Sequence, residues 1–334
     1  MKKTLAMILV IAMVLGLGLL TGCGKEEGSD TTLALVVAGT FGDRSFYDSS
    51  KEGADRLAKD LGINVTYIEC NNDSHTTQMQ NAADKADIVV LVGWEFYEVE
   101  TVAPNYPNVK FIWVDNATST EIPNVLNITY AQNEGSFLAG YIAAAMSKTG
   151  VVGAVGGEDS DTINDFIVGY KQGAEFYGSE TGKAIEVVNN YTNSYDDPTT
   201  GKNCAIALNG QGADVIFQIA SAAGDGVFEA AKEKGFYAIG VDSDQKYIDP
   251  EVIICSMKKE VGNSIYDAVE ALLNTEIDLM NNTHLWVTDL SSGYVGIGYG
   301  EEGSVQQIPD DLKTTVAKLA IQIANCNILV DTTR

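Results

Sequence analysis

Two aromatic side chains stand where a binding site for a flat heterocycle could form. Phe46 and Tyr195 each lie just beyond a candidate β-strand, in separate halves of the chain. Two rings placed in this way can sandwich a base, and such stacking contributes about 1 to 3 kcal/mol per base. Trp94, directly after the strand-ending Gly93, is a third candidate wall, although it could equally cap the sheet. Phe46 could instead pack on the helix that follows it, as a hydrophobic staple.

Asp242 and Gly224 could supply the polar part of the same site. Asp242 ends a candidate strand over 237–242, and a carboxylate there can accept two hydrogen bonds from the hydroxyl groups of a ribose. Gly224 fits a loop whose backbone approaches a ligand closely, because glycine has no side chain. The alternatives are a solvated acidic turn for Asp242 and an ordinary turn for Gly224. As a ligand group Asp242 would hold the sugar while the rings hold the base.

A hydrolase built on the same site would need catalytic groups, and the sequence offers only carboxylates for that role. Asp43, Glu134 and Asp242 are the ones that a nucleoside or sugar hydrolase could use. The sequence has no recognisable Ser-His-Asp set and no Cys nucleophile with a His partner. We therefore expect a binding protein with no catalytic residue, and we keep the hydrolase as the alternative.

The cysteines and histidines show no metal-site pattern. Cys70, Cys204, Cys255 and Cys326 are too widely spaced for a C-x-x-C motif, and the whole chain has only two histidines. Three of these cysteines, at 70, 255 and 326, lie in or beside apolar runs, where a thiol typically acts as a small core residue. We expect no metal and no cofactor, and we favour free buried thiols over disulfides.

The N-terminus has the pattern of an export signal with a lipid-attachment site. A positive start at Lys2 and Lys3 precedes an apolar run over 5–20, and Leu-Thr-Gly ends at Cys23. The run is short for a membrane-spanning helix, which needs about 20 apolar residues. The segment resembles the lipobox of bacterial lipoproteins. This resemblance implies a signal peptide over 1–22, a lipid on Cys23 and a flexible spacer over 23–32.

The chain as a whole is strongly acidic, and it becomes more so without Lys2 and Lys3. The 21 Lys and Arg residues face 46 Asp and Glu residues, which gives a formal net charge of −25. Such a body would be repelled by nucleic acid and by anionic lipid headgroups. We therefore expect no nucleic-acid partner, and contact with the cell membrane only through the lipid anchor, on the extracytoplasmic face.

Hydrophobic periodicity predicts an α/β protein, because short β-rich runs alternate with longer amphipathic stretches. Continuous apolar strands of this kind are typical of parallel sheets that are buried on both faces. The expected strands are 33–39, 64–70, 87–93, 109–115, 125–131, 151–157, 184–191, 214–220, 237–242, 252–257, 284–289 and 294–299. The expected helices are 48–61, 76–85, 133–148, 162–177, 201–209, 226–234, 261–273 and 309–324.

The predicted elements divide into two similar halves of about four β-α units each, which predicts two doubly wound lobes. After residue 257 the order of elements changes, and we expect this tail to recross between the lobes and form a hinge of several strands. Lobe 1 would comprise 33–128 with about 256–288, and lobe 2 would comprise 129–255 with about 289–334. A ligand would bind between them, at the carboxyl ends of both sheets.

Short motifs in a characteristic order give the sequence a recognisable relationship. They include Gly42-Asp43-Arg44-Ser45-Phe46-Tyr47-Asp48, Val92-Gly93-Trp94, Phe111-Ile112-Trp113-Val114-Asp115, Ala223-Gly224-Asp225-Gly226, Gly240-Val241-Asp242 and Ser256-Met257-Lys258-Lys259. In this set and order the chain resembles the basic membrane protein family, lipoproteins related to purine-nucleoside-binding components of ABC transporters. The resemblance covers essentially the whole mature chain. It implies a type I periplasmic-binding-protein-like fold that captures a nucleoside and delivers it to an ABC transporter permease. A ligand-sensing surface lipoprotein would share the fold and the pocket.

The resemblance also implies roles for single residues. Asp43, Ser45 and Phe46 match the family's Gly-Asp-Lys-Ser-Phe-Asn segment, and Phe46 matches one ring of the family's aromatic clamp. Tyr195 lies near the position of the second ring.

Two further matches concern the sugar. Asp242 resembles the family's sugar-binding Asp, and Lys259 matches its sugar-binding Lys. Lys258 is the neighbouring alternative, because a shift of one residue in a strand reverses the direction of the side chain.

The chain departs from the family pattern at two places. Gln132 stands where purine-nucleoside binders of the family carry an Asp that would bond the base edge, and the first loop, 37–42, lacks their early Asp. An amide both donates and accepts hydrogen bonds, whereas an ionised carboxylate only accepts them. The sequence therefore predicts a broader base selectivity than that of these relatives.

Overall fold

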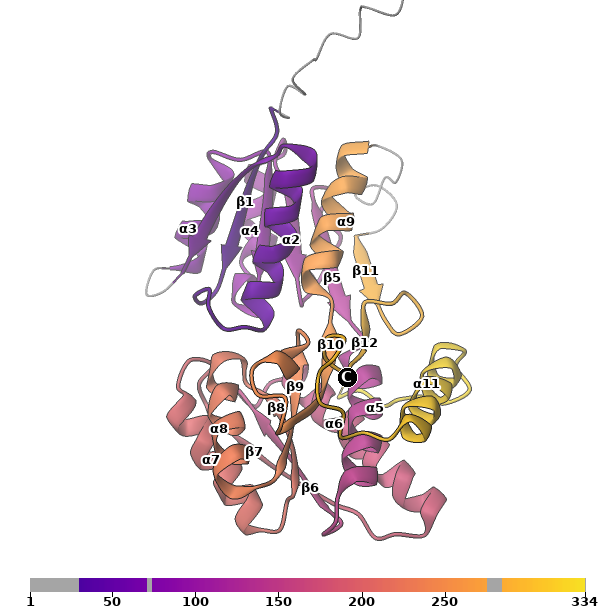
Figure 1. The fold of residues 1–334 in the computed structure, drawn as a ribbon. Coiled ribbons are helices and arrows are strands. Elements are labelled where there is room, and N and C mark those ends of the chain that lie inside the picture. Colours follow the sequence, from indigo (N-terminus) through magenta and orange to yellow (C-terminus); the bar gives the residue numbers. More distant parts are fainter. Residues whose placement is uncertain (1–29, 71–73, 275–283, 334) are drawn as a thin grey trace, which may run out of the picture.

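The protein folds into two lobes, which the computed structural model describes over residues 30–70, 74–274 and 284–333. Figure 1 shows one lobe above the other. The predicted signal peptide and its lipid-attachment residue Cys23 lie outside the described residues. In the part of the chain that the structure describes, every helix is too short or too polar to span a membrane.

Lobe 1 contains a six-stranded parallel sheet in the order β11-β5-β4-β3-β1-β2. Strand β1, which lies between β3 and the edge strand β2, is buried on both faces, because Leu33 and Leu35 pack toward one side while Ala34 and Val36 pack toward the other. The strands are β1 (Thr32–Val37), β2 (Asn64–Glu69), β3 (Ile88–Val92), β4 (Lys110–Val114), β5 (Val125–Tyr130) and β11 (Leu285–Thr288).

Helices cover both faces of this sheet. On one face lie α2 (Phe46–Leu61) and α9 (Val261–Asn274), which pack against each other. On the other face lie α3 (His75–Ala83) and α4 (Val99–Val102). The stretch from η1 (Trp94–Phe96) through α4 to η2 (Ala103–Asn105) is helical, although the sequence pattern predicted no element there.

Lobe 2 repeats the arrangement with a sheet in the order β12-β10-β9-β8-β6-β7. All neighbours are parallel except β12, which runs antiparallel to β10. Its strands are β6 (Val151–Gly156), β7 (Glu186–Tyr191), β8 (Val215–Ile219), β9 (Tyr237–Asp242), β10 (Ile253–Lys259) and β12 (Val295–Gly298). The flanking helices are α5 (Gln132–Met146), α6 (Asp161–Thr181), α7 (Pro198–Gly210) and α8 (Asp225–Lys234).

Helices α5 and α6 touch backbone to backbone, and glycine makes this possible. A Cβ atom on Gly140 would lie 1.9 Å from the Tyr170 carbonyl oxygen, and one on Gly173 would lie 1.9 Å from the Phe137 carbonyl oxygen. Because no side chain can fit there, glycine at these two positions allows α5 and α6 to pack closely against each other in lobe 2.

The chain crosses between the lobes three times. It leaves lobe 1 between β5 and α5, returns between β10 and α9, and crosses again between β11 and β12. Hydrogen bonds join these crossings, since the Ala131 amide donates to the Thr288 carbonyl at 2.7 Å and the Glu260 amide donates to the Tyr294 carbonyl at 2.8 Å. The predicted architecture of two doubly wound lobes with a recrossing tail is thus confirmed.

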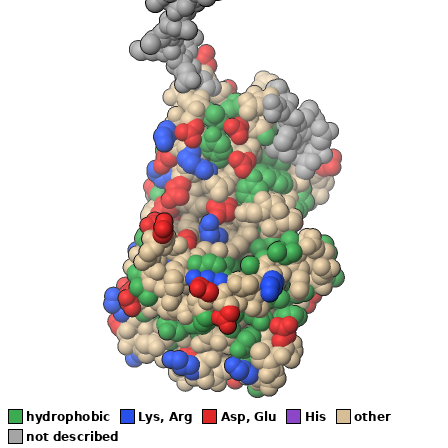
Figure 2. All heavy atoms as spheres, turned by 45° about the vertical axis from the view of Figure 1, so that its right-hand side comes forward, with side chains coloured by type: hydrophobic (Ala, Val, Ile, Leu, Met, Phe, Trp, Pro, Cys, Tyr) green, Lys and Arg blue, Asp and Glu red, His purple; other side chains and the backbone are tan. Residues whose placement is uncertain are grey.

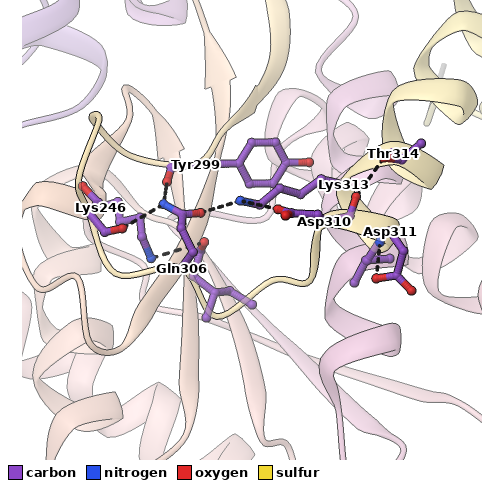
Figure 3. A network of polar contacts seen from close by, with 10 residues as sticks. Lys246, Tyr299, Gln306, Asp310, Asp311, Lys313 and Thr314 are labelled. Carbon is purple, nitrogen blue, oxygen red and sulfur yellow. Dashed lines mark hydrogen bonds and ion pairs between the residues drawn. The ribbon is translucent and has the colours of Figure 1, made fainter.

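The last helix, α11 (Asp310–Ala324), packs on α5 of lobe 2. Figure 3 shows how the loop before it is held: Gln306 donates to the Tyr299 carbonyl at 2.9 Å and accepts from Lys313 Nζ at 2.7 Å. Beside this loop, the fully buried Lys246 donates to the Ile253 carbonyl at 2.6 Å. The tail is therefore a fixed part of lobe 2.

The cysteines follow the expectation in part. Cys204, Cys255 and Cys326 carry free thiols, and Cys70 is buried. Cys255 is buried as predicted, but Cys326 is exposed because it lies just after the end of α11, beyond the face that this helix packs on lobe 2. The prediction of a buried thiol was wrong for Cys326.

Candidate functional site

A cavity lies between the lobes, where the carboxyl ends of both sheets meet. About 630 Å³ of space there, counted with the solvent at the mouth, is free of protein atoms. Its lining comprises Phe46, Tyr47, Gly93, Trp94, Glu95, Asp115, Ser160, Thr162, Ile163, Phe166, Tyr195, Ile219, Ser221, Val241, Asp242 and Lys259.

The sheet order explains this position. In lobe 1, β1 lies between β2 and β3, and in lobe 2, β6 lies between β7 and β8. The chain therefore leaves the first strand of each lobe toward one side of the sheet and later returns to its other side. Open α/β sheets bind ligands outside such a switch point. Here the loops after β1 and β3 face the loops after β6 and β8, and each contributes to the lining.

Aromatic rings from both lobes form the walls. Phe46 is the first residue of α2, and Trp94 follows β3 in lobe 1 with 44% of its surface exposed. Tyr195 comes from the loop after β7 in lobe 2 and packs against Gly157, where a Cβ atom would lie 2.1 Å from the Tyr195 ring. The structure therefore brings together the three rings that the sequence suggested as walls.

A buried ion pair joins the lobes inside the cavity. Lys259 ends β10 of lobe 2, and its Nζ lies 2.7 Å from Oδ1 of Asp115, the residue after β4 of lobe 1. Lys259 is 2% exposed, and its ammonium also lies 5.0 Å from the centre of the Phe46 ring. Lys258 points elsewhere, pairs with Glu260 and does not line the cavity, so Lys259 is the lysine that faces a ligand.

Asp242 occupies the end of β9 beside this pair. It accepts a hydrogen bond from the Ser45 hydroxyl at 2.5 Å. Burial raises the pKa of Asp242 to about 6, although the positive charge of Lys259 and the Ser45 hydrogen bond work in the opposite direction. A carboxylate and an ammonium side by side can accept from and donate to hydroxyl groups of the same ligand.

The segment 43–45 of lobe 1 holds lobe 2 rather than lining the cavity. Asp43 accepts from the backbone amides of Tyr47 and Asp48, both at 3.0 Å, and thereby caps α2. It also accepts from the hydroxyl of Ser221 in lobe 2 at 2.8 Å. Arg44 forms an ion pair with Asp225 of lobe 2. These contacts place Asp43 and Ser45 at the junction of the closed lobes.

Two other predicted residues also lie outside this lining. Gln132 is buried and lines a neighbouring cavity that shares Asp115 and Thr162 with the first one. Gly224 ends η3 (Ser221–Gly224), where a Cβ atom would lie 1.8 Å from Oε1 of Gln218, so its close neighbour is that side chain.

Two acidic residues of the lining were not singled out from the sequence. Glu95 follows Trp94, and its Oε2 is buried without a hydrogen-bond partner among the described residues. Burial raises the pKa of Glu95 to about 7, and the nearby negative charges of Glu158 and Asp115 add to the rise. The sequence clue for both residues was their position shortly after a buried strand, since Glu95 follows β3 and Asp115 follows β4. The same clue identified Trp94.

Three residues at strand ends have a left-handed backbone. The φ angle is 75° at Asp115, 50° at Ser221 and 62° at Asp242, and all three line the cavity. Residues other than glycine rarely adopt this conformation, and such strained positions cluster at functional sites. The surrounding structure thus holds these three residues in an unfavourable backbone conformation, and in this conformation they line the cavity.

The acidity of the protein is not concentrated at the site. Figure 2 shows Asp and Glu side chains spread over both lobes on the face in view. Inside the cavity, however, the carboxylates of Glu95, Asp115 and Asp242 face the single ammonium of Lys259 within the described lining. Such a cavity suits an uncharged ligand with a flat face and hydroxyl groups.

Comparisons with known proteins agree with this geometry. A family model named Bmp, described as ABC transporter substrate-binding protein PnrA-like, matches residues 30–328. Basic membrane protein A2 of Borrelia garinii subsp. bavariensis is 32% identical over an alignment of 323 positions that covers 93% of this chain and 91% of that protein. Basic membrane protein A of Borreliella burgdorferi is 31% identical over 345 residues, covering 99% of this chain and 96% of that protein.

A solved structure extends the likeness to three dimensions. The crystal structure of an ABC transporter system solute-binding protein from Aeropyrum pernix K1 matches with a TM-score of 0.81 and 27% identity, over 91% of this chain and 94% of that one. The predicted type I periplasmic-binding-protein-like fold of two parallel-sheet lobes is confirmed by this match.

Proposed function

Since the chain belongs to the Bmp family of PnrA-like ABC transporter substrate-binding proteins, we propose that it captures a purine nucleoside between its lobes. The observation that carries this proposal is the pairing of aromatic walls from both lobes with a carboxylate and an ammonium at one end of the same cavity. The rings would stack on the base, and Asp242 with Lys259 would bind the ribose hydroxyls.

The charge of the lining supports a nucleoside over a nucleotide. A phosphate group would enter a cavity where Glu95, Asp115 and Asp242 outnumber Lys259, and Lys259 is already paired with Asp115. Like charges in a partly desolvated site repel one another strongly. We therefore expect phosphorylated ligands to bind far more weakly than the nucleosides.

Capture proceeds by closure of the lobes about the three crossings. A ligand that contacts rings and polar groups of both lobes binds the closed form better than the open form, and it shifts the equilibrium toward closure by that difference in affinity. Asp43, Arg44 and Ser45 contact lobe 2 in this structure, and we expect these contacts to add to the stability of the closed form.

The protein would act at the outer face of the cell membrane. We place a lipid on Cys23 and delivery of the nucleoside to the permease of an ABC importer. Labelling with a fatty-acid analogue should mark the full chain and not a Cys23→Ala variant. Loss of nucleoside uptake in a strain without the gene would support import, and unchanged uptake would favour a sensing role.

Isothermal titration of residues 24–334 with nucleosides, the free sugars and the matching nucleotides tests the ligand class. We expect binding of purine nucleosides, loss of at least tenfold in affinity in Lys259→Met, and no change in Lys258→Met. Binding of a free sugar with silence across nucleosides would refute the assignment. Recovery of the intact nucleoside from the complex supports a binder, whereas release of free base with turnover would support the hydrolase alternative.

A further inference from the structure

The carboxylate of Glu95 is held in a fixed position at the wall of the cavity. It folds back over the end of β3, where a Cβ atom on Gly93 would lie 2.5 Å from Oε2 of Glu95. Gly93 has a φ angle of 127°, which a residue with a side chain rarely adopts. The missing Cβ atom of Gly93 thus leaves the room in which the Glu95 carboxylate lies.

One oxygen of this carboxylate lacks a hydrogen-bond donor among the described residues, although the backbone amide of Glu95 itself contributes a hydrogen bond to the group. Its Oε2 is buried and accepts no hydrogen bond from any described residue. The charged groups that act on Glu95 are Glu158 of lobe 2 and Asp115, both negative, while Lys259 is engaged with Asp115. A buried acceptor without a donor costs about 1 to 3 kcal/mol or more. A ligand that brings donors to this oxygen would remove that cost.

Glu95 and Asp242 enter the cavity from different lobes, Glu95 after β3 and Asp242 at the end of β9. The charged neighbours of Asp242 are Lys259, Asp43 and Asp115, whereas those of Glu95 are Glu158 and Asp115. Lys259 therefore acts on Asp242 and not on Glu95. If Asp242 and Lys259 hold the sugar, the edge of the base lies toward Glu95, beside the wall that Trp94 forms.

We infer that Glu95, and not Gln132, is the specificity-determining residue: it accepts hydrogen bonds from the donor edge of the base, so that the site prefers guanine-type bases to adenine instead of showing the broad selectivity that Gln132 suggested. This inference rests on the proposed function. Guanine presents a ring N–H next to an amino group, which matches the two oxygens of a carboxylate, and hypoxanthine presents the ring N–H alone. Adenine places a ring nitrogen lone pair beside its amino group, and a carboxylate, which only accepts, is repelled by that lone pair.

The experiment is a titration of wild type, Glu95→Gln and Glu175→Gln with guanosine, inosine and adenosine at pH 8. Glu175 lies on the exposed side of α6 and serves as the matched control. We expect wild type and the control to bind guanosine at least tenfold more tightly than adenosine, with inosine between them. In Glu95→Gln the guanosine affinity should fall at least tenfold and the ratio should shrink to within threefold.

The possible failures point to different errors. Equal affinity for guanosine and adenosine in wild type, or an unchanged ratio in Glu95→Gln, overturns the role of Glu95 and leaves nucleoside binding intact. Silence of wild type toward all three ligands overturns the proposed function, and this inference with it. Thermal unfolding of Glu95→Gln checks the fold, and we expect an equal or higher midpoint because the change removes a buried charge.

Discussion

Replacement of Asp242 by Asn should stabilise the protein and weaken its ligand binding at the same time. Burial raises the pKa of Asp242 from 3.8 to about 6, so the ionised form is less favourable in the folded protein than in the unfolded chain. Protonated Asp242 therefore favours the folded protein. This stabilisation is fully present below about pH 4 and is lost as the pH rises through about 6. At pH 8 this loss is on the order of 3 kcal/mol.

A neutral Asn avoids that loss and fits the site in two other respects. Asn tolerates the left-handed backbone at this position, where φ is 62°, and its carbonyl oxygen can still accept from Ser45. We therefore expect the free energy of unfolding at pH 8 to rise by about 2 to 3 kcal/mol, with little difference near pH 4. Nucleoside affinity should fall by about tenfold or more, because one acceptor for the ribose is lost.

Urea unfolding at pH 8 and pH 4, together with titration of a nucleoside, measures both effects. Asp60→Asn changes an exposed carboxylate of α2 and should alter neither. An equal or lower stability of Asp242→Asn at pH 8 would refute the argument that burial of the charge raises the pKa. A gain in stability with unchanged affinity would show that Asp242 is strained by burial but does not touch the sugar.

Three further changes have expected outcomes of their own. Phe46→Ala should weaken nucleoside affinity by about ten- to a hundredfold with little change in the unfolding temperature, and the reverse result would identify Phe46 as a staple on α2. Lys259→Met should lower the free energy of unfolding by about 1 to 3 kcal/mol, because the partly buried Asp115 would keep an unpaired charge, whereas Lys258→Met should change it by no more than about 0.5 kcal/mol. Arg44→Ala should raise the dissociation rate of the ligand several-fold in stopped-flow measurements, because the lobes lose one contact across the closed cleft; an unchanged rate would mean that this ion pair does not hold the closed form.

The sequence was a good guide to the elements because continuous apolar runs identify buried parallel strands. All twelve expected strands overlap strands of the two sheets. The helical stretch over 94–105 was missed because it consists of single turns interrupted by Pro104, too short for a helical period to show.

The site was less predictable than the fold. Phe46, Trp94, Tyr195, Asp242 and Lys259 all line one cavity, and their contacts with a ligand stay a prediction. Position after a strand identified these residues, but it could not reveal what surrounds them. Glu95 and Glu158 are 63 positions apart and come close because the two lobes meet. A local sequence pattern cannot predict such a contact.

Asp43 shows the limit of motif reasoning in another way. It belongs to the segment that suggested a ligand role, yet it caps α2 and binds Ser221. A short acidic residue before a helix fits either role from sequence, because both need the same acceptor atoms at the same place. Only the contacts distinguish them.

The three crossings also constrain the order in which the protein can form during synthesis. Lobe 1 begins with β1, but its sheet and its helical layer stay incomplete until α9 and β11 have been made, after all five parallel strands of lobe 2. Until then the edge of β5 lacks the strand that pairs with it, and an unpaired edge invites contacts with other chains. A ribosome-bound or exported chain that stops before residue 288 would thus carry a nearly finished lobe 2 beside an open lobe 1.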